Sequence, residues 1–428
     1  MSSSSDPSSP SSDPSSPSNL ATTLTAELDA LLRPADEDLL ARFPGDLRGR
    51  QPVHTVYVPA DAFDAGLLPR WGQQARAALD GHEPLLAGLL GRRAEDVLPL
   101  VGAKLDREPV EDLRIDLEDG YGQRPDDEED AHVRAAATGL ARAQCEGQAP
   151  PFTGIRVKSL EAPTRARCVR SLTGFLATLL EAGGHLEGFV VTLPKVTSVA
   201  QVEAMVLACG RVEDALGLPG GRLRFEIQVE TPQSVLGPDG TALVAPMIHA
   251  GQGRVSALHY GTYDYSAFCG IPAPFQAADH PVADHAKLVM QAAAAGTGVR
   301  LSDGSTNVLP VGSPEQVRTA WVVHTELVRR ALERGYYQGW DLHPAQLPSR
   351  FGATYVFYRE HAPAAGARLR AYLDGVGGAV ADEPATARAL SDLLVRGLDC
   401  GALLPQEVDD LAGVPVDELL ALARPRRG

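Results

Sequence analysis

The sequence predicts an α/β protein built as a (β/α)8 barrel, with a disordered N-terminal tail and a helical C-terminal extension. Short β-prone runs alternate with longer Ala- and Leu-rich segments from residue 53 onward. This alternation indicates βαβ units and a parallel sheet. Eight such units in roughly 290 residues fit a barrel with one enlarged connection. Charged residues close five of the runs, as expected where barrel strands end at a common mouth.

Four regions follow from composition along the 428 residues. Residues 1–19 are almost entirely Ser, Pro and Asp, so they cannot offset the entropy of ordering and are expected to be disordered. Residues 20–52 are expected to form an N-terminal helical segment and 53–360 the catalytic barrel. Residues 361–428 are expected to form a helical lid or an oligomerisation region.

Within the barrel, the pattern gives eight strands and five clear helices. The strands are expected at 54–59, 113–118, 154–158, 188–194, 223–230, 256–261, 299–303 and 339–343, and the helices at 130–144, 165–181, 199–216, 282–295 and 314–334. The stretch 61–112 is longer than a single crossover helix needs. An open doubly wound sheet is the alternative, but no G-x-G-x-x-G follows the first strand.

The C-terminal extension reads as helices only. They are expected at 364–373, 384–396, 405–412 and 416–423, with a Gly-rich hinge at 375–382.

Composition restricts the classes of partner. The net charge of −16 argues against nucleic acid, which requires a basic surface, but does not exclude a small anionic substrate held by local charge. No apolar run is long enough to span a bilayer, and no secretory signal is visible. The five cysteines are scattered and odd in number, which favours free thiols and a cytoplasmic location.

Five short pieces close strands and therefore define the expected site. They are Asp116-Leu117-Glu118-Asp119, Ile155-Arg156-Val157, Pro194-Lys195, Val229-Glu230-Thr231 and Gly261-Thr262-Tyr263-Asp264. Because a barrel gathers its strand ends around one mouth, these residues are expected to form a site for one metal ion and one small anion.

Glu230 and Asp264 are the candidate metal ligands. Mg²⁺ is usually held by one or two carboxylates together with water and substrate oxygens. The alternative for either acid alone is a cap on the following helix.

Arg156 closes an apolar strand, where a guanidinium either grips a substrate carboxylate or forms a structural ion pair, for example with Glu118. Both readings remain open from residue type alone. Asp116 and Glu118 lie on the same face of their strand and need cations nearby. For Asp119, the sequence favours a turn residue.

Lys195 is expected to pair with acids, since neighbouring carboxylates raise the pKa of an amine and disfavour its use as a nucleophile. His343 could act as an acid or base, but a lone histidine is more often structural. The signatures of P-loop, serine hydrolase and zinc peptidase chemistry are absent from the sequence.

The chain contains, in this order, the motifs DLED, RV, PK, VET, G-x-x-D and DLHPAQL. This series resembles the HpcH/HpaI aldolase and citrate lyase β-subunit family, of the phosphoenolpyruvate/pyruvate superfamily. The opening Val56-Tyr57-Val58-Pro59-Ala60-Asp61 is similar to that family's first strand. The resemblance spans about 53–357.

The resemblance implies Mg²⁺ (with Mn²⁺ as an alternative) on Glu230 and Asp264, and Arg156 on substrate oxygens. Arg156, Glu118 and Lys195 are the candidate catalytic residues, and Arg156 and Asp116 the candidate substrate-binding residues. Two departures concern the substrate: Lys158 stands where the family often has Asn, and acids occupy 126–130 where it commonly has Lys.

The implied activity is that of a carbon–carbon lyase of aldolase type, acting through an enolate on a 2-oxo acid or a 3-hydroxyacyl-CoA. A homotrimer or homohexamer is the implied assembly. Two alternatives stay open: an inactive barrel that serves as a binding or regulatory subunit, and a thioester hydrolase or condensing enzyme using the same pocket.

Overall fold

The computed structural model describes residues 17–375 and 383–425. The predicted disorder of 1–19 falls almost wholly outside these ranges, as does the expected hinge at 375–382, except for its first residue. By their contacts, residues up to Pro44 form one unit and Gly45–Arg426 a second, compact unit.

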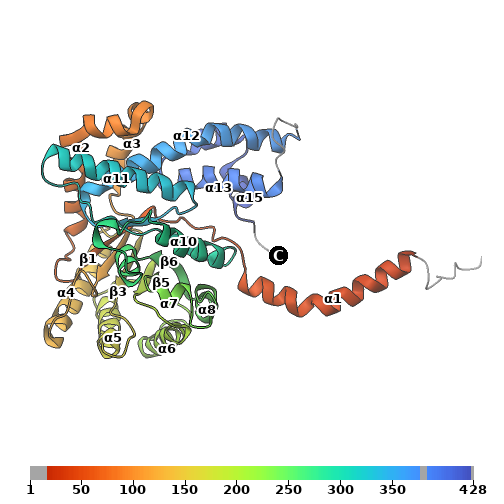
Figure 1. Ribbon diagram of the computed structural model, residues 1–428, viewed down its shortest axis with the longest axis horizontal. Helices are drawn as coiled ribbons and strands as arrows, with labels where there is room; N and C mark the ends of the chain where they lie inside the picture. The colour runs from red at the N-terminus through yellow and green to blue at the C-terminus, as the bar shows by residue number, and fades with distance from the viewer. Residues whose placement is uncertain (1–16, 376–382, 426–428) are drawn as a thin grey trace, which may run out of the picture. The chain divides into compact units, whose positions relative to one another are not determined.

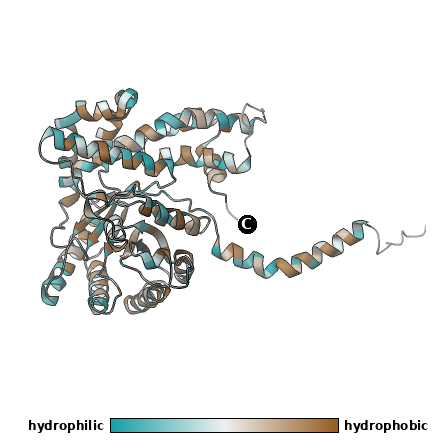
Figure 2. Ribbon diagram, in the orientation of Figure 1, coloured by the Kyte–Doolittle hydropathy of each residue, from teal (hydrophilic) through white to brown (hydrophobic). Residues whose placement is uncertain are grey.

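The first unit is dominated by helix α1 (Pro17–Arg42). Seven of its leucines are 42 to 74% exposed: Leu20, Leu24, Leu28, Leu31, Leu32, Leu39 and Leu40. Figure 2 shows apolar and polar residues alternating along this helix. It begins three residues before the helical segment expected at 20, so Pro17–Asn19 are helical.

The second unit contains the predicted (β/α)8 barrel (Figure 1). Its strands are β1 (His54–Pro59), β2 (Asp112–Asp116), β3 (Phe152–Arg156), β4 (Phe189–Leu193), β5 (Arg224–Val229), β6 (Val255–Tyr260), β7 (Arg300–Ser302) and β8 (Gly339–Asp341). All pair in parallel, in the order β7-β6-β5-β4-β3-β2-β1-β8. A parallel bridge between Ser302 and Gln338 closes the ring.

Helices surround the strands, as the alternating pattern predicts. They are α4 (Asp126–Cys145), α5 (Arg165–Glu181), α6 (Val199–Leu216), α7 (Pro232–Val235), α8 (Val244–Ala250), α9 (Thr262–Phe268), α10 (Pro281–Ala294) and α11 (Pro314–Glu333), with single 3-10 turns η2 (Ala273–Phe275) and η3 (Pro344–Gln346). Strand residues that face outward, such as Ile115, Ile155 and Val191, are fully buried against these helices, which is the main source of hydrophobic stabilisation in such a fold.

The enlarged connection is a helical hairpin. Within 61–112 lie α2 (Leu67–Leu90), the 3-10 turn η1 (Gly91–Arg93) and α3 (Ala94–Arg107). Helix α12 (Leu347–Leu373) contacts both α2 and α3.

The C-terminal helices belong to the same compact unit as the barrel. Helix α12 runs unbroken across residue 360, so the expected domain boundary falls inside a helix. It is followed by α13 (Pro384–Cys400), α14 (Pro405–Ala412) and α15 (Val416–Ala423). These helices share a second apolar cluster, which includes Leu369, Leu394 and Leu419.

The barrel interior beneath its mouth is ionic. Arg114 of β2 donates to both carboxylate oxygens of Glu226 on β5, at 3.0 and 2.8 Å, and also pairs with Asp112. His259 Nε2 lies 3.1 Å from Glu226. A Cβ at Gly154 would stand 1.9 Å from the carbonyl oxygen of Val190 and 3.1 Å from Cδ of Arg114, so glycine is needed for the close approach of β3 and β4 and also leaves room for the Arg114 side chain.

Among the described residues, no helix has the length and apolar character needed to cross a bilayer. All five cysteines are unpaired.

Candidate active site

The structure brings the six sequence-predicted site residues together at the C-terminal mouth of the barrel. Asp116 and Arg156 end β2 and β3, and Glu118, Lys195 and Glu230 follow β2, β4 and β5 within two residues. Asp264 lies in the first turn of α9, after β6. The strand register fixes this convergence, since Asp116 pairs directly with Arg156.

Arg156 is held by a bidentate ion pair. Its Nε donates to Asp116 Oδ1 and its Nη2 to Asp116 Oδ2, both at 2.7 Å, and Nη1 lies 3.4 Å from Glu118. Burial works against the charged guanidinium, but the Asp116 and Glu118 carboxylates raise the pKa of Arg156 well above its ordinary value. Arg156 is therefore a fixed cation at the base of the mouth.

Two aromatic rings support the same guanidinium. The Arg156 guanidinium carbon lies 4.8 Å from the ring centroid of Tyr57 and 5.9 Å from that of Trp340, within cation–π range. The Trp340 indole donates to His259 Nδ1 at 3.1 Å, which ties this aromatic pair to the ionic layer below.

Glu230 is completely buried. Its Oε1 accepts the backbone N–H of Lys195 at 2.7 Å, and its Oε2 accepts from the side-chain amide of Gln228. Burial, together with the carboxylates of Asp264 and Glu118, raises the pKa of Glu230 to about 8. The buried carboxyl group of Glu230 therefore has too little positive charge around it in the protein.

Lys195 links the acids of the mouth. Its Nζ donates to Glu118 Oε1 and to both oxygens of Asp119, at 2.8 and 2.7 Å, and lies 3.8 Å from Asp264. Burial alone would lower the pKa of Lys195, but Glu118 and Asp119 raise it, as the sequence predicts for an ion-pairing lysine. The backbone of Lys195 has a φ of +51°, a left-handed conformation that is uncommon outside glycine.

The donor set suits a divalent cation. Five carboxyl groups (Asp116, Glu118, Asp119, Glu230 and Asp264) share two cations, Arg156 and Lys195. Burial, and proximity to Asp119, raise the pKa of Asp264 although Lys195 opposes this. Within the described ranges, no three His, Cys, Asp or Glu side chains are arranged as a metal cage. Glu230 and Asp264 instead form the sparse pair of carboxylates typical of Mg²⁺ sites.

Two acids of the mouth have partners that the sequence does not reveal. Asp116 is predicted to bind substrate, but both its oxygens are occupied: Oδ1 also accepts from the Glu118 N–H and Oδ2 from the Gly120 N–H, each at 2.9 Å. It therefore orients Arg156. Asp119 lies in a turn, as predicted, but its carboxylate also belongs to the site through Lys195. A turn assignment based on the Asp-Gly pair cannot anticipate a partner from β4.

Two further residues have structural partners. Lys158 donates to the carbonyl oxygens of Leu117 and Gly122 at 2.7 and 3.1 Å and pairs with Glu129, which stabilises the loop after β2. His343 accepts the N–H of Ala345 as a cap of η3. Burial lowers the pKa of His343, consistent with this structural role.

Sequence reasoning missed Tyr57, Trp340 and Gln228. Each lies on the interior face of a strand, deeper in the barrel than the strand-end residues that form the predicted site. The motif Val56-Tyr57-Val58 contained one of them, but an aromatic residue in a strand is ordinarily read as core.

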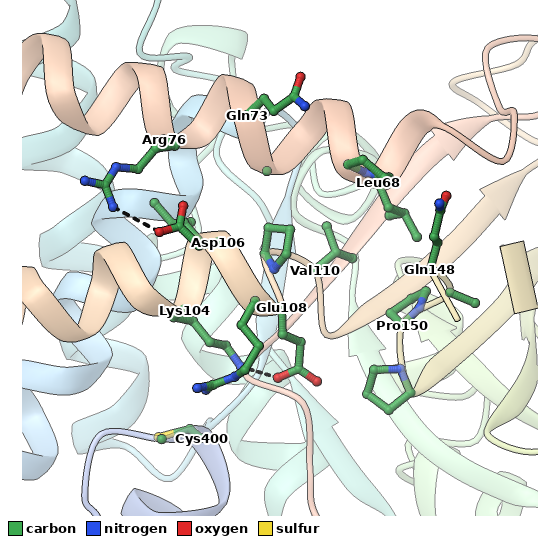
Figure 3. Close-up of a pocket in the computed structure, with 18 of the residues that line it drawn as sticks. Leu68, Gln73, Arg76, Lys104, Asp106, Glu108, Val110, Gln148, Pro150 and Cys400 are labelled. Atoms are coloured by element: carbon green, nitrogen blue, oxygen red, sulfur yellow. Dashed lines mark hydrogen bonds and ion pairs between the residues drawn. The ribbon is translucent and has the colours of Figure 1, made fainter. Parts of the chain in front are cut away.

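A large cavity lies elsewhere, at the N-terminal end of the barrel, between α2, α3 and the loop after α13. It measures about 1040 Å³, and Figure 3 shows Lys104, Glu108, Arg76 and Asp106 in its wall. Most of its cations are paired: Arg76 with Asp80 and Asp106, and Lys104 with Glu108 and Glu111. In barrel enzymes, catalytic groups gather at the opposite end, so the mouth is the better candidate.

Comparison with known proteins gives one family and a set of similar folds. The model of a family described as "Domain of unknown function (DUF6986)" matches residues 32–427. No curated protein sequence matches the chain. A citrate lyase from Burkholderia xenovorans LB400 is similar in structure, with a TM-score of 0.57 and 20% identity over 85% of this chain and 97% of the other. This likeness confirms the predicted fold.

Two other solved structures are less similar. CitE from Mycobacterium tuberculosis, in complex with magnesium, acetoacetate and coenzyme A, has a TM-score of 0.47 and 20% identity, covering 83% of this chain and all of the other. Malate synthase from Haloferax volcanii, as a lead(II) complex, has a TM-score of 0.48 and 17% identity, covering 88% and 89%.

Proposed function

We propose that this chain, which belongs to the DUF6986 family, is a magnesium-dependent enzyme that makes or breaks a carbon–carbon bond beside a carbonyl group. The observation that carries the proposal is the placement of Glu230 and Asp264 beside a fixed guanidinium at the mouth of the barrel. Chemistry that passes through an enolate needs positive charge where the oxyanion develops, and this arrangement supplies it.

Glu230 and Asp264 would hold the Mg²⁺ ion, with water and substrate oxygens completing its octahedral shell. Bound Mg²⁺ would supply Lewis-acid polarisation of the substrate carbonyl and positive charge for the enolate oxygen. Gln228 and the Lys195 N–H already orient the Glu230 carboxylate, which is the kind of support that metal ligands require.

Arg156 would bind the substrate's carboxylate or carbonyl oxygens. Asp116 occupies its Nε and Nη2, so Nη1, 3.4 Å from Glu118, is the nitrogen least committed to the protein. The rings of Tyr57 and Trp340 fix the plane of the guanidinium. A substrate with two oxygens close together would suit this arrangement, such as a 2-oxo acid, with oxygens on adjacent carbons, or a 3-hydroxyacyl-CoA, with oxygens on carbons 1 and 3.

Lys195 and Glu118 would control charge at the reacting carbon. The ammonium group is held by Glu118 and Asp119, which raise its pKa, so it acts as a fixed cation and not as a Schiff-base nucleophile. Burial raises the pKa of Glu118 above its ordinary value although Arg156 and Lys195 oppose this, and a carboxyl group beside the reacting carbon is the kind of group that serves as a general acid or base.

The test is deuterium incorporation into the methyl group of pyruvate and of acetyl-CoA in D2O, followed by NMR with the full chain and Mg²⁺. We expect exchange that depends on Mg²⁺ and is lost in Glu230→Gln and Asp264→Asn, whereas Glu203→Gln, an exposed substitution on α6, retains it. Calorimetric titration with MgCl2 should lose its binding signal in the same two variants.

Retained Mg²⁺ affinity in the double variant would overturn the ligand assignment. Metal binding without exchange on either compound would overturn the enolate chemistry for these substrates and favour a binding or regulatory subunit.

A further inference from the structure

Three arginines line a second, smaller cavity at the N-terminal end of the barrel. Arg300 comes from β7, Arg396 from α13, and Arg424 follows α15. The cavity measures about 180 Å³, several times the roughly 30 Å³ that one water occupies in the liquid. We refer to it as the arginine pocket.

The arginine pocket is short of negative charge. Its one acidic lining residue, Asp46, pairs with Arg388 at 2.6 Å. Asp392 is shared by Arg396 and Arg424, at 2.6 and 3.0 Å, and Asp399 lies 3.5 Å from Arg424. Arg300 has no carboxylate within ion-pair distance among the described residues.

Of the three arginines that line the pocket, Arg300 has the fewest partners among the described residues. Its Nη2 donates to the carbonyl oxygen of Gly49 at 2.8 Å, and within the described residues its Nε and Nη1 have no hydrogen-bond acceptor. Burial and the charges of Arg396, Arg424 and Arg224 lower the pKa of Arg300 to about 10. The guanidinium is still charged at neutral pH, and a partly buried charge without a partner is costly.

Neighbouring groups add further donors. Arg396 uses Nε on Asp392 and Nη1 on Gln51, so its Nη2 remains available on the described part of the chain. The face of its guanidinium packs on Tyr337, with 4.0 Å between the guanidinium carbon and the ring centroid, which fixes its direction. Arg224, also at this end of the barrel, has a buried Nε without a partner among the described residues.

The larger cavity at the same end of the barrel is a useful contrast. There, Arg50, Arg76 and Lys104 each pair with at least one carboxylate. Figure 3 shows Arg76 beside Asp106. Of the cations that line the larger cavity, only the exposed Arg107 has no carboxylate partner among the described residues, whereas in the arginine pocket the half-buried Arg300 lacks one.

We propose that the arginine pocket binds a small tetrahedral oxyanion, either inorganic phosphate or the phosphoryl group of a larger molecule. Guanidinium groups present paired N–H donors that match the oxygens of such an anion. The anion would bridge Arg300 of the barrel and Arg396 of α13, and so connect the C-terminal helices to the strands. This site is separate from the mouth and independent of the function proposed above.

The experiment is a titration of the full chain with sodium phosphate, measured by calorimetry and by Tm, against NaCl of equal ionic strength. We expect saturable binding and a rise in Tm that NaCl does not reproduce. Arg300→Met should weaken phosphate binding about tenfold or more. Without phosphate, the same variant should melt no lower than the parent, because removing a half-buried cation that has no carboxylate partner offsets the lost hydrogen bond to Gly49.

Arg165→Met is the matched control. Arg165 is exposed and, like Arg300, hydrogen-bonds to a backbone carbonyl, that of Leu160 at 3.1 Å. It should bind phosphate as the parent does, and so should Arg156→Lys, which alters the mouth. An ADP titration separates the two sources: competition with phosphate that is lost in Arg300→Met supports a phosphoryl-bearing ligand, and binding of phosphate alone supports the free ion.

Two results would overturn the proposal. One is a phosphate effect no larger than that of NaCl. The other is undiminished phosphate affinity in Arg300→Met.

Discussion

Gly261 leaves the space in which the Glu230 side chain lies. A Cβ at position 261 would stand 2.5 Å from Cβ of Glu230 and 2.7 Å from its Oε2. The φ of Gly261 is −99°, which any residue can adopt, so the requirement for glycine is one of space and not of backbone conformation. The glycine after β6 and the glutamate after β5 thus form one structural unit of the mouth.

Gly261→Ala should therefore displace the Glu230 carboxylate. We expect the free energy of unfolding to fall by about 1–3 kcal/mol, as for other overpacked sites, and Mg²⁺ affinity to fall with it. Calorimetry and chemical denaturation measure the two effects. Gly210→Ala on α6 is the control, since its added Cβ meets nothing within 4 Å; it should gain up to about 1 kcal/mol and bind Mg²⁺ normally. Unchanged Mg²⁺ affinity in Gly261→Ala would contradict the expectation.

Arg156→Lys keeps the positive charge but loses the planar guanidinium that donates two hydrogen bonds to Asp116. A lysine cannot reproduce two parallel hydrogen bonds or the packing on Tyr57. We expect the rate of Mg²⁺-dependent exchange to fall by roughly 10²–10³, with Mg²⁺ affinity retained. Arg170→Lys, an exposed residue paired with Asp130, should leave the rate unchanged. Parent-like exchange in Arg156→Lys would show that a single positive charge suffices there.

Lys195→Gln tests whether the ammonium group competes with the metal. It removes a cation 3.8 Å from Asp264 while keeping the backbone N–H that donates to Glu230. We expect Mg²⁺ to bind more tightly, by roughly tenfold or less, because less positive charge opposes it. Turnover should nevertheless fall, since the cation at the reacting carbon is lost. If affinity and turnover fell together, Lys195 would be better described as a structural support of the metal site.

Glu213 lies away from the mouth and contributes to the stability of the fold to an extent that depends on pH. Hydrogen bonds from Arg254, at 2.6 and 2.7 Å, and from the N–H groups of Leu223 and Gly221 outweigh burial and lower its pKa from 4.5 to about 2. Because the folded-state pKa is the lower one, the stabilisation is fully present above pH 4.5 and is lost as the pH falls towards 2.

Glu213→Gln should cost about 3 kcal/mol near neutral pH and progressively less below pH 4.5. Denaturation curves recorded between pH 7 and pH 2.5 measure this difference. Glu203→Gln on the same helix, exposed to solvent, should cost close to nothing at any pH. A cost for Glu213→Gln that does not change with pH would point to lost packing and not to charge.

The local pattern was sufficient for the barrel but not for its interior. Helices α5, α6, α14 and α15 begin and end where the sequence predicts, because apolar spacing and turn residues are local signals. Helix α12 begins at Leu347, well before the helix expected from residue 364, because 347–358 are buried nearly all round and show no amphipathic period.

The site was predictable to the extent that it depends on strand ends. Glu230, Asp264, Arg156 and Lys195 were found because each closes a strand. The ion pair of Asp119 cannot be predicted in this way, because its partner Lys195 is 76 residues away and reaches it only through the barrel register. The left-handed backbone of Lys195 likewise has no signature in its sequence.

The closure of the barrel is uneven, and this has a dynamic consequence. Strands β7 and β8 have three residues each, and they meet through the bridge between Ser302 and Gln338 and a hydrogen bond from the Asp303 N–H to the Gln338 carbonyl, at 2.8 Å. The seven other strand pairs are joined over three or more aligned residues. The contact between β7 and β8 is therefore where the barrel is expected to open first during local unfolding. In native-state hydrogen exchange, the amide of Asp303 should therefore exchange well before those in the centre of β3 and β4.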